Sequence, residues 1–213
     1  MVVEVKVIEK KNNRLWVSIK GVPIQYANAL RRICLNQVPI MAIDSIDVIK
    51  NFTVMTDEDL AHRLGMIPLK TNLTRFAEPH ACKCNSEIGC INCRVMLVLQ
   101  ADSRNETYTV MSDELISEDT DVKPTSQGIP IAILAPGQSI HIEAYARLGR
   151  GTEHAKWNSS NIAVLIPGDN PEEYVLIVEG TGALSPEMVI NKAVEELGEK
   201  MKEFKSKVKE LNV

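Results

Sequence analysis

Apolar and polar positions alternate along much of the chain in patterns typical of strands and helices. Two short alternating runs, 3–7 and 15–19, flank the polar segment Lys10–Asn13 and predict a β-hairpin with one buried face. Apolar residues at helical spacing predict a helix over Ile24–Gln37, between Pro23 and Pro39. A short helix is expected over 57–64, and strands over 43–48, 94–101, 107–111, 131–134, 139–148, 162–166 and 174–178. We expect 94–101 and 107–111 to pair with each other around a polar turn.

The longest periodic segment follows Ser185, an expected helix N-cap, and Pro186, which suits a first helical position. Its apolar positions are spaced 4, 3, 4, 3, 4 and 3 residues apart, an a/d pattern over three heptads that we call the apolar seam: Ile190, Val194, Leu197, Met201, Phe204, Val208 and Leu211. The charged residues between them are expected on solvated faces.

Another part of this chain or a second chain must cover this seam, because seven apolar side chains left in contact with water would lose on the order of 10 kcal/mol of stabilisation. The only other sizeable helix is about half as long. The helix could lie on its own sheet, or part of the seam could pack against a second chain. We favour the second interpretation because of the length of the seam.

Composition excludes several classes of protein. The chain of 213 residues is 45% hydrophobic and has a net charge of −4, so it is globular and lacks the basic surface of an autonomous nucleic-acid binder. Extensive direct DNA contact is therefore not expected. No apolar run reaches the ~20 residues of a membrane span, and the first residues do not form a signal peptide. We expect a cytoplasmic protein without a membrane partner.

Four of the five cysteines fall within twelve residues in the pattern C-x-C-x5-C-x2-C: Cys82, Cys84, Cys90 and Cys93. Four thiolates in one short loop fit a tetrahedral, coordinatively closed and therefore structural Zn²⁺ site. An iron–sulfur cluster, a labile disulfide pair and an empty site are the alternatives. The spacing does not match the ferredoxin run, so we favour one structural zinc ion and do not expect a cluster.

Catalytic constellations are not evident in the sequence. None of the four histidines accompanies a nucleophile in a known pattern, and there is no P-loop or dinucleotide fingerprint. We expect no catalytic residues.

Several segments together resemble the D-type family of archaeal RNA polymerase subunits, the counterparts of the bacterial α subunit and of the eukaryotic third-largest polymerase subunit. The segments occur in family order: YANALRR (26–32) with Val38-Pro39, AHRLGMIPL (61–69), VKP (122–124), IPI (129–131), AYARLGRG (144–151) and EHAKW (153–157). They span nearly the whole chain, and their combination is specific although no single segment is.

The resemblance implies an α+β fold with a discontinuous dimerisation domain, 1–42 and 149–213, built from an antiparallel sheet and two helices. A mostly β insert domain, 43–148, interrupts it and carries the Cys-rich loop 82–93. It also implies a non-catalytic assembly-platform subunit of a DNA-directed RNA polymerase, a nucleotidyltransferase complex. The small L-type polymerase subunit would form a heterodimer with the chain and cover the apolar seam together with Ile24, Ala27 and Leu30. The large and other small subunits would dock on the pair.

Six residues are expected to contact a large subunit: Arg31, Arg32, Arg150, His154, Lys156 and Trp157. Arginine and aromatic side chains are favoured at interfaces, and these lie in the family's segments. Many archaeal relatives carry an iron–sulfur insertion after the EHAKW segment, but here only 158–173 fills that position, without cysteine. The alternative function is a zinc- or iron–sulfur-dependent redox or regulatory module that homodimerises through its last helix.

Overall fold

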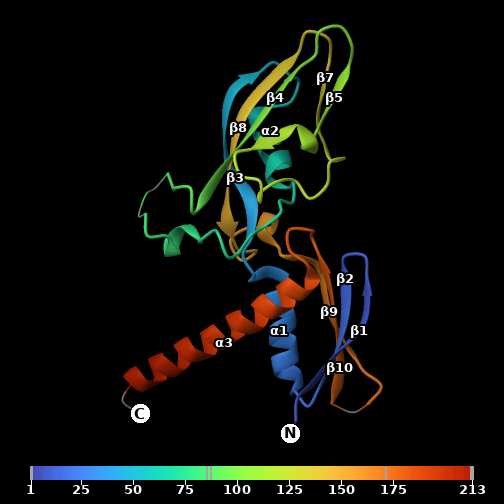
Figure 1. Ribbon diagram of the computed structural model, residues 1–213, viewed down its shortest axis with the longest axis vertical. Coiled ribbons are helices and arrows are strands. Elements are labelled where there is room, and N and C mark those ends of the chain that lie inside the picture. The colour runs from blue at the N-terminus through green and yellow to red at the C-terminus, as the bar shows by residue number, and fades with distance from the viewer. Residues whose placement is uncertain (1, 85, 87, 171, 212–213) are drawn as a thin grey trace. The chain divides into compact units, whose positions relative to one another are not determined.

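The computed structural model (Figure 1) describes residues 2–84, 86, 88–170 and 172–211. The chain forms two compact units, one from Met1–Val38 with Arg150–Val213 and the other from 39–149. The predicted boundaries lie within four residues of these breaks. We call the two parts the discontinuous unit and the inserted unit.

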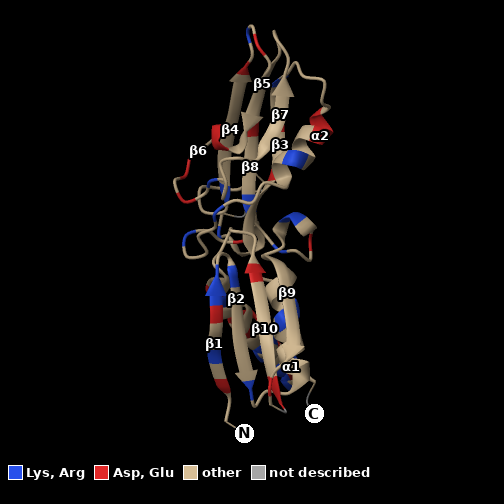
Figure 2. Ribbon diagram, turned by 90° about the vertical axis from the view of Figure 1, so that its right-hand side faces the viewer, with Lys and Arg blue, Asp and Glu red and all other residues tan. Residues whose placement is uncertain are grey.

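The discontinuous unit is a four-stranded antiparallel sheet with two helices on one face. The strands β1 (Glu4–Lys11), β2 (Arg14–Lys20), β9 (Ser160–Pro167) and β10 (Glu173–Gly180) lie in the order β1-β2-β10-β9 (Figure 2). The helices are α1 (Ile24–Asn36) and α3 (Pro186–Glu210), and a 3-10 turn, η3, covers Ala155–Trp157. Helix α1 contacts β9, β10 and α3, and α3 contacts β10 and β2.

Local sequence explains how these elements begin and turn. Asn12 adopts a left-handed conformation (φ 53°) in the hairpin turn, which asparagine tolerates better than most residues. The Ser185 hydroxyl accepts a hydrogen bond from the Met188 N–H at 3.3 Å, and Pro186 occupies the first turn of α3. The predicted cap of the last helix is confirmed.

The inserted unit is mostly β. Strands β3 (Ile40–Asn51), β4 (Arg94–Asp102), β6 (Leu115–Ser117) and β8 (Ser139–Gly149) form an antiparallel sheet in the order β3-β8-β4-β6, and β5 (Tyr108–Met111) pairs with β7 (Pro130–Leu134). Helix α2 (Asp57–Gly65) and the 3-10 turns η1 (Pro79–Ala81) and η2 (Ser112–Glu114) complete it. Leu60 and Leu64 of α2 join Leu97, Leu99 and Ile142 of the sheet in one buried core.

One predicted pairing is wrong, although the α+β fold class is confirmed. The segments 94–101 and 107–111 are both strands but do not pair, since β4 lies between β8 and β6 while β5 pairs with β7. The Ser103 N–H donates to the Gln138 carbonyl at 2.9 Å, so the chain leaving β4 follows the turn before β8. It therefore does not fold straight back on β4.

Candidate protein interface and metal centre

The apolar seam of α3 is largely exposed in the chain. Val194, Met201, Phe204, Val208 and Leu211 are all exposed, Phe204 to 64%, and Ile190 and Leu197 are half-buried. Every described residue from Gly198 to Leu211 is exposed. This second half of α3, which we call the free half, extends beyond α1 and the sheet of its own unit (Figure 1).

A different stripe of α3 faces its own chain. Pro186, Val189, Ala193 and Glu196 are buried, and they lie on the side of the helix that contacts α1 and the sheet. The helix thus carries two stripes, one that closes its own unit and one, the apolar seam, that the described chain leaves uncovered.

The sheet edge carries further exposed apolar side chains, on the sheet face that the helices cover. Val5 and Val7 of β1 lie opposite Ile19 and Val17 of β2, and cross-strand partners share a face of a sheet. Val17 and Ile19 are buried on the helix-covered face, whereas Val5 and Val7 are 62% and 63% exposed. The helix face of the discontinuous unit is therefore only partly covered.

Helix α1 contributes less to this surface than the sequence predicted. Ile24 is exposed and Leu30 is half-buried, but Ala27 is 1% exposed because its methyl group packs inside its own unit. The prediction that Ala27 contacts a partner is wrong for this reason. Tyr26, which the sequence analysis did not assign to a partner surface, is 52% exposed.

A buried ion pair joins α3 to the segment that enters the discontinuous unit. The Arg150 guanidinium donates to Glu196 Oε2 at 2.6 Å and Oε1 at 3.3 Å, and to the Gln37 carbonyl at 2.7 Å at the end of α1. Glu196 is 5% exposed, although its charge predicted a solvated position. Arg150 therefore positions α3 against α1, and its expected contact with a large subunit stays a prediction.

The sequence did not identify Glu196, although a signal was present. Val189, Ala193 and Glu196 recur at intervals of four and three residues, as the members of the apolar seam do. A stripe that ends in a glutamate indicates that a cation from elsewhere in the chain lies against it.

The other predicted contact residues differ in exposure. Arg32 and His154 are exposed, Lys156 is half-buried, and Arg31 is half-buried and donates to Asn28 Oδ1 at 2.8 Å. Trp157 is 2% exposed, and the Lys156 ammonium lies 4.3 Å from its ring centroid. The Trp157 indole belongs to the core of its unit and cannot itself contact another subunit, so that prediction is also wrong.

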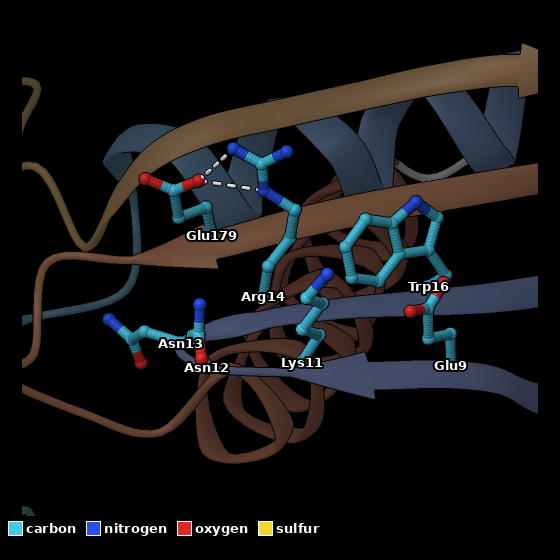
Figure 3. Close-up of a pocket in the computed structure, with 7 residues that line it drawn as sticks. All are labelled: Glu9, Lys11, Asn12, Asn13, Arg14, Trp16 and Glu179. Carbon is cyan, nitrogen blue, oxygen red and sulfur yellow. Dashed lines mark hydrogen bonds and ion pairs between the residues drawn. The ribbon is translucent and has the colours of Figure 1, made fainter.

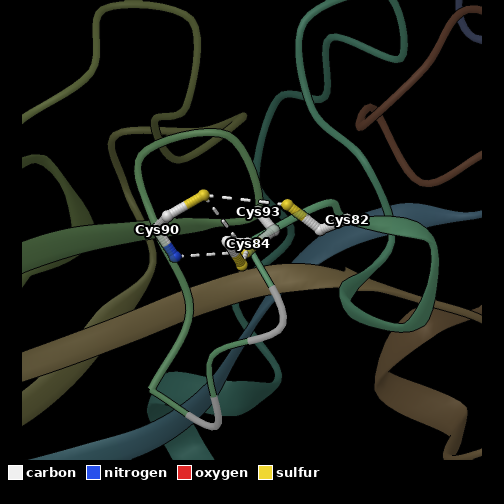
Figure 4. A group of neighbouring side chains, drawn as sticks. All are labelled: Cys82, Cys84, Cys90 and Cys93. Carbon is white, nitrogen blue, oxygen red and sulfur yellow. Dashed lines mark hydrogen bonds between the residues drawn. The ribbon is translucent and has the colours of Figure 1, made fainter.

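The inserted unit brings the four predicted cysteine ligands together. Their Sγ atoms all lie within 4.8 Å of one another and point toward a common centre (Figure 4). The Sγ atoms of Cys82 and Cys90 are 3.7 Å apart, those of Cys84 and Cys93 3.8 Å, and those of Cys90 and Cys93 3.9 Å. Four sulfurs at ~2.3 Å from a tetrahedral ion lie about 3.8 Å apart, so this donor set fits such an ion.

Backbone groups support the thiolate form at this cluster. The Cys90 N–H donates to Cys93 Sγ at 3.2 Å, and the Asn92 N–H donates to Cys90 Sγ at 3.4 Å. A hydrogen bond from the Ser86 backbone lowers the pKa of Cys84 to about 7, whereas burial raises the pKa of Cys93 to about 12. A bound cation would favour the deprotonated form of all four thiols.

Arg94 ties the Cys-rich loop to the sheet. Its guanidinium lies 3.7 Å from the Tyr145 ring centroid and donates to the Ile88 carbonyl at 2.6 Å. Arg94 directly follows Cys93 and begins β4, so its contacts with Tyr145 and Ile88 hold the Cys-rich loop against the sheet.

A hollow of about 540 Å³ lies at the hairpin end of the discontinuous unit (Figure 3). It is lined by Glu9, Lys11, Asn12, Asn13, Arg14, Trp16 and Glu179. Arg14 forms an ion pair with Glu179, and its guanidinium lies 5.7 Å from the Trp16 ring centroid. None of the seven is a serine, cysteine or histidine, so this lining offers no hydroxyl or thiol nucleophile paired with an imidazole.

Sequence comparison identifies the family. The model described as the RNA polymerase Rpb3/RpoA insert domain matches residues 36–169, well over half of the chain. The chain belongs to this family. The match confirms the resemblance inferred from the sequence segments, and it does not support the alternative of a redox or regulatory module.

Similar proteins carry the name DNA-directed RNA polymerase subunit Rpo3. The protein of Methanosphaera stadtmanae is 40% identical over 158 residues, which cover 73% of this chain and 58% of the relative. That of Pyrococcus furiosus is 43% identical over 155 residues, 73% of this chain and 56% of the relative. That of Aeropyrum pernix is 40% identical over 167 residues, which cover 76% of this chain and 58% of the relative. The chain thus spans under three fifths of the length of these curated relatives.

Among the described residues, no helix combines the length and the apolar character that crossing a membrane requires.

Proposed function

We propose that this chain is a non-catalytic assembly-platform subunit of a DNA-directed RNA polymerase that acts in the cytoplasm. The observation that carries the proposal is the exposed apolar seam of α3 in a chain of the Rpb3/RpoA family. Burying a large apolar side chain contributes ~1.5–3 kcal/mol, so a partner that covers Met201, Phe204 and Leu211 gains several kcal/mol.

The partner at this seam is the small L-type polymerase subunit. Support also comes from Ile24 and the exposed valines of β1, which are further apolar side chains that the described part of the discontinuous unit leaves exposed, and from the half-buried Leu30. Association is therefore hydrophobic, and it places two chains side by side as one platform.

The large subunits dock on a more polar surface of this pair. Arg32 and His154 are exposed and remain the contact residues of the proposal, with Arg31 and Lys156 beside them in sequence. Arginine suits such a surface because its guanidinium binds carboxylates in a bidentate manner.

Copurification tests the proposed function. A tagged wild-type chain, expressed in its native host, should bring down the large polymerase subunits and one small subunit. The matched variant Met201→Gln/Phe204→Gln should retain its circular dichroism spectrum and lose the small subunit, with at least ~100-fold weaker association because central apolar contacts dominate interfaces. A wild-type chain that brings down no polymerase subunit would refute the proposal.

The Cys-rich loop holds one structural zinc ion through Cys82, Cys84, Cys90 and Cys93. Four thiolates leave no open coordination position, so the ion crosslinks the loop and supplies no reactive water. The sulfur separations near 3.8 Å support this assignment.

Metal analysis tests the zinc assignment. One zinc per chain and no visible absorbance are expected, and Cys90→Ser should lower the zinc content while Cys34→Ser, a cysteine of the buried core, leaves it unchanged. Iron with visible absorbance, or a metal-free wild-type chain purified under reducing conditions, would contradict it.

A further inference from the structure

The free half of α3 carries lysines at the positions that border its apolar seam. With Val194, Met201 and Val208 at a positions, Lys200 and Lys207 occupy g and Lys205 occupies e. Residues at e and g lie at the rim of a buried a/d seam, and their charges determine which helix can pair with it. Three of the four e and g positions in the free half are therefore cationic, and the fourth is Gly198 at its start.

Acidic residues of the same half do not neutralise this rim. Glu203 and Glu210 lie at c positions, farther from the seam. The Lys207 ammonium is 3.5 Å from a Glu210 carboxylate oxygen, but both side chains are more than 60% exposed, so the pair is weak. Lys200 donates to the Gln37 side chain of α1 and is tied to its own unit. We call Lys205 and Lys207 the lysine flank.

The first half of α3 lacks such charges. Its e and g positions, Pro186, Asn191 and Ala193, are uncharged, and Ala193 is buried against its own unit. Charged residues that could select a partner helix therefore border the apolar seam only in the free half.

Two copies of this chain are poorly matched to each other at the free half. If two free halves overlap, each lysine flank meets the other, and like charges at an interface oppose association. If two α3 helices overlap along their whole length in opposite directions, each flank meets uncharged e and g positions and gains no ion pair.

We propose that the free half of α3 selects a helix of a different chain whose apolar stripe is bordered by Asp or Glu, and that the lysine flank disfavours self-pairing. This inference rests on the proposed function, which requires a partner other than a second copy. It adds the chemistry by which that partner is recognised, since specificity needs both an attractive match and a repulsive element against the wrong partner.

Charge reversal supplies a direct test. The flank variant Lys205→Glu/Lys207→Glu creates a seam with acidic borders, and the control Lys202→Glu/Lys209→Glu makes the same change of charge at b positions away from the seam. In sedimentation velocity at low ionic strength, a 1:1 mixture of wild type and flank variant should dimerise at least ~10-fold more tightly than either chain alone. High salt should reduce this difference.

Three results would overturn the inference: a mixture that does not dimerise, a wild type that dimerises alone as tightly as the mixture, or a control variant that pairs with wild type equally well. Copurification gives a second readout, in which the flank variant should capture at least ~10-fold less of the small polymerase subunit than the control variant. Equal capture by the two variants would also overturn it. A wild type that captures no polymerase subunit refutes the proposed function, whereas the mixing experiment tests the lysine flank independently.

Discussion

The two units of the chain treat their apolar side chains differently. In the inserted unit, Leu97, Leu99 and Ile142 of the sheet and Leu60 and Leu64 of α2 are fully buried in one core. In the discontinuous unit, α3 buries Val189 and Ala193 but exposes Met201 and Phe204 on its other stripe.

The exposed apolar residues also differ in arrangement. Those of the discontinuous unit include five at heptad spacing along α3 and further ones on β1. Those of the inserted unit lie on several separate segments, among them Ile49, Phe52 and Val54 at and after the end of β3, Ile88 and Ile91 in the Cys-rich loop, Ile116 on β6 and Ile133 on β7. Contiguous exposed apolar surface marks an interaction site, while scattered residues need no explanation. The comparison supports the proposal that a partner completes the discontinuous unit, whereas the inserted unit encloses a core of its own.

The largest effect should come from breaking the ion pair that holds α3. Arg150→Ala leaves the buried Glu196 carboxylate without its main cation, which should cost ~3–5 kcal/mol of unfolding free energy. Both tryptophans lie in the discontinuous unit, so urea denaturation followed by tryptophan fluorescence measures this loss. The exposed Arg32→Ala serves as the control, and an Arg150→Ala variant as stable as this control would show that the ion pair does not hold α3.

A pair of alanine variants sharpens the comparison of the two units. Leu97→Ala should destabilise the chain by ~2–5 kcal/mol because it opens a cavity in a closed core. Met201→Ala should change stability by less than ~0.5 kcal/mol because its side chain is exposed. Urea denaturation followed by circular dichroism compares the two, and equal losses would mean that the apolar seam is buried in the free chain.

The smallest expected effect concerns the start of α3. Glu187 forms an ion pair with Lys10 at 2.6 Å, and that contact lowers the pKa of Glu187 below its ordinary value of 4.5. A group with a lowered pKa in the folded state stabilises the fold above its ordinary pKa and loses this contribution as the pH falls through the folded value. Lys10→Met should therefore cost less than ~1 kcal/mol at pH 7 and nothing in strong acid. A cost that is the same at both pH values would contradict this cause.

Local signals in the sequence predicted much of the fold. The Ser185 cap, the helix over 24–37 and the hairpin depend on neighbours in the chain, and the structure has all three. The four cysteine ligands lie within twelve residues, so their proximity also followed from sequence. Exposure of the apolar seam was inferred because no second helix of matching length was present.

Features that depend on distant contacts were predicted less well. Glu196 is buried because Arg150, 46 positions away, neutralises it, and Trp157 is buried although its segment is rich in charge. Ala27 shares a helical pattern with Ile24, yet only Ala27 faces the core. The pairing of β4 with β8 joins residues 37 to 53 positions apart, and no local pattern distinguishes it from a hairpin with β5.

The most direct test of the central claim, that a polymerase subunit covers the free half of α3, is site-specific photocrosslinking in the native host. A photoreactive phenylalanine analogue at Phe204, in the apolar seam, should crosslink to a small polymerase subunit. The same analogue at Ser206, which lies on the opposite side of α3, should give little of that product. Equal crosslinking from both positions, or a product from 204 that contains no polymerase subunit, would contradict the account.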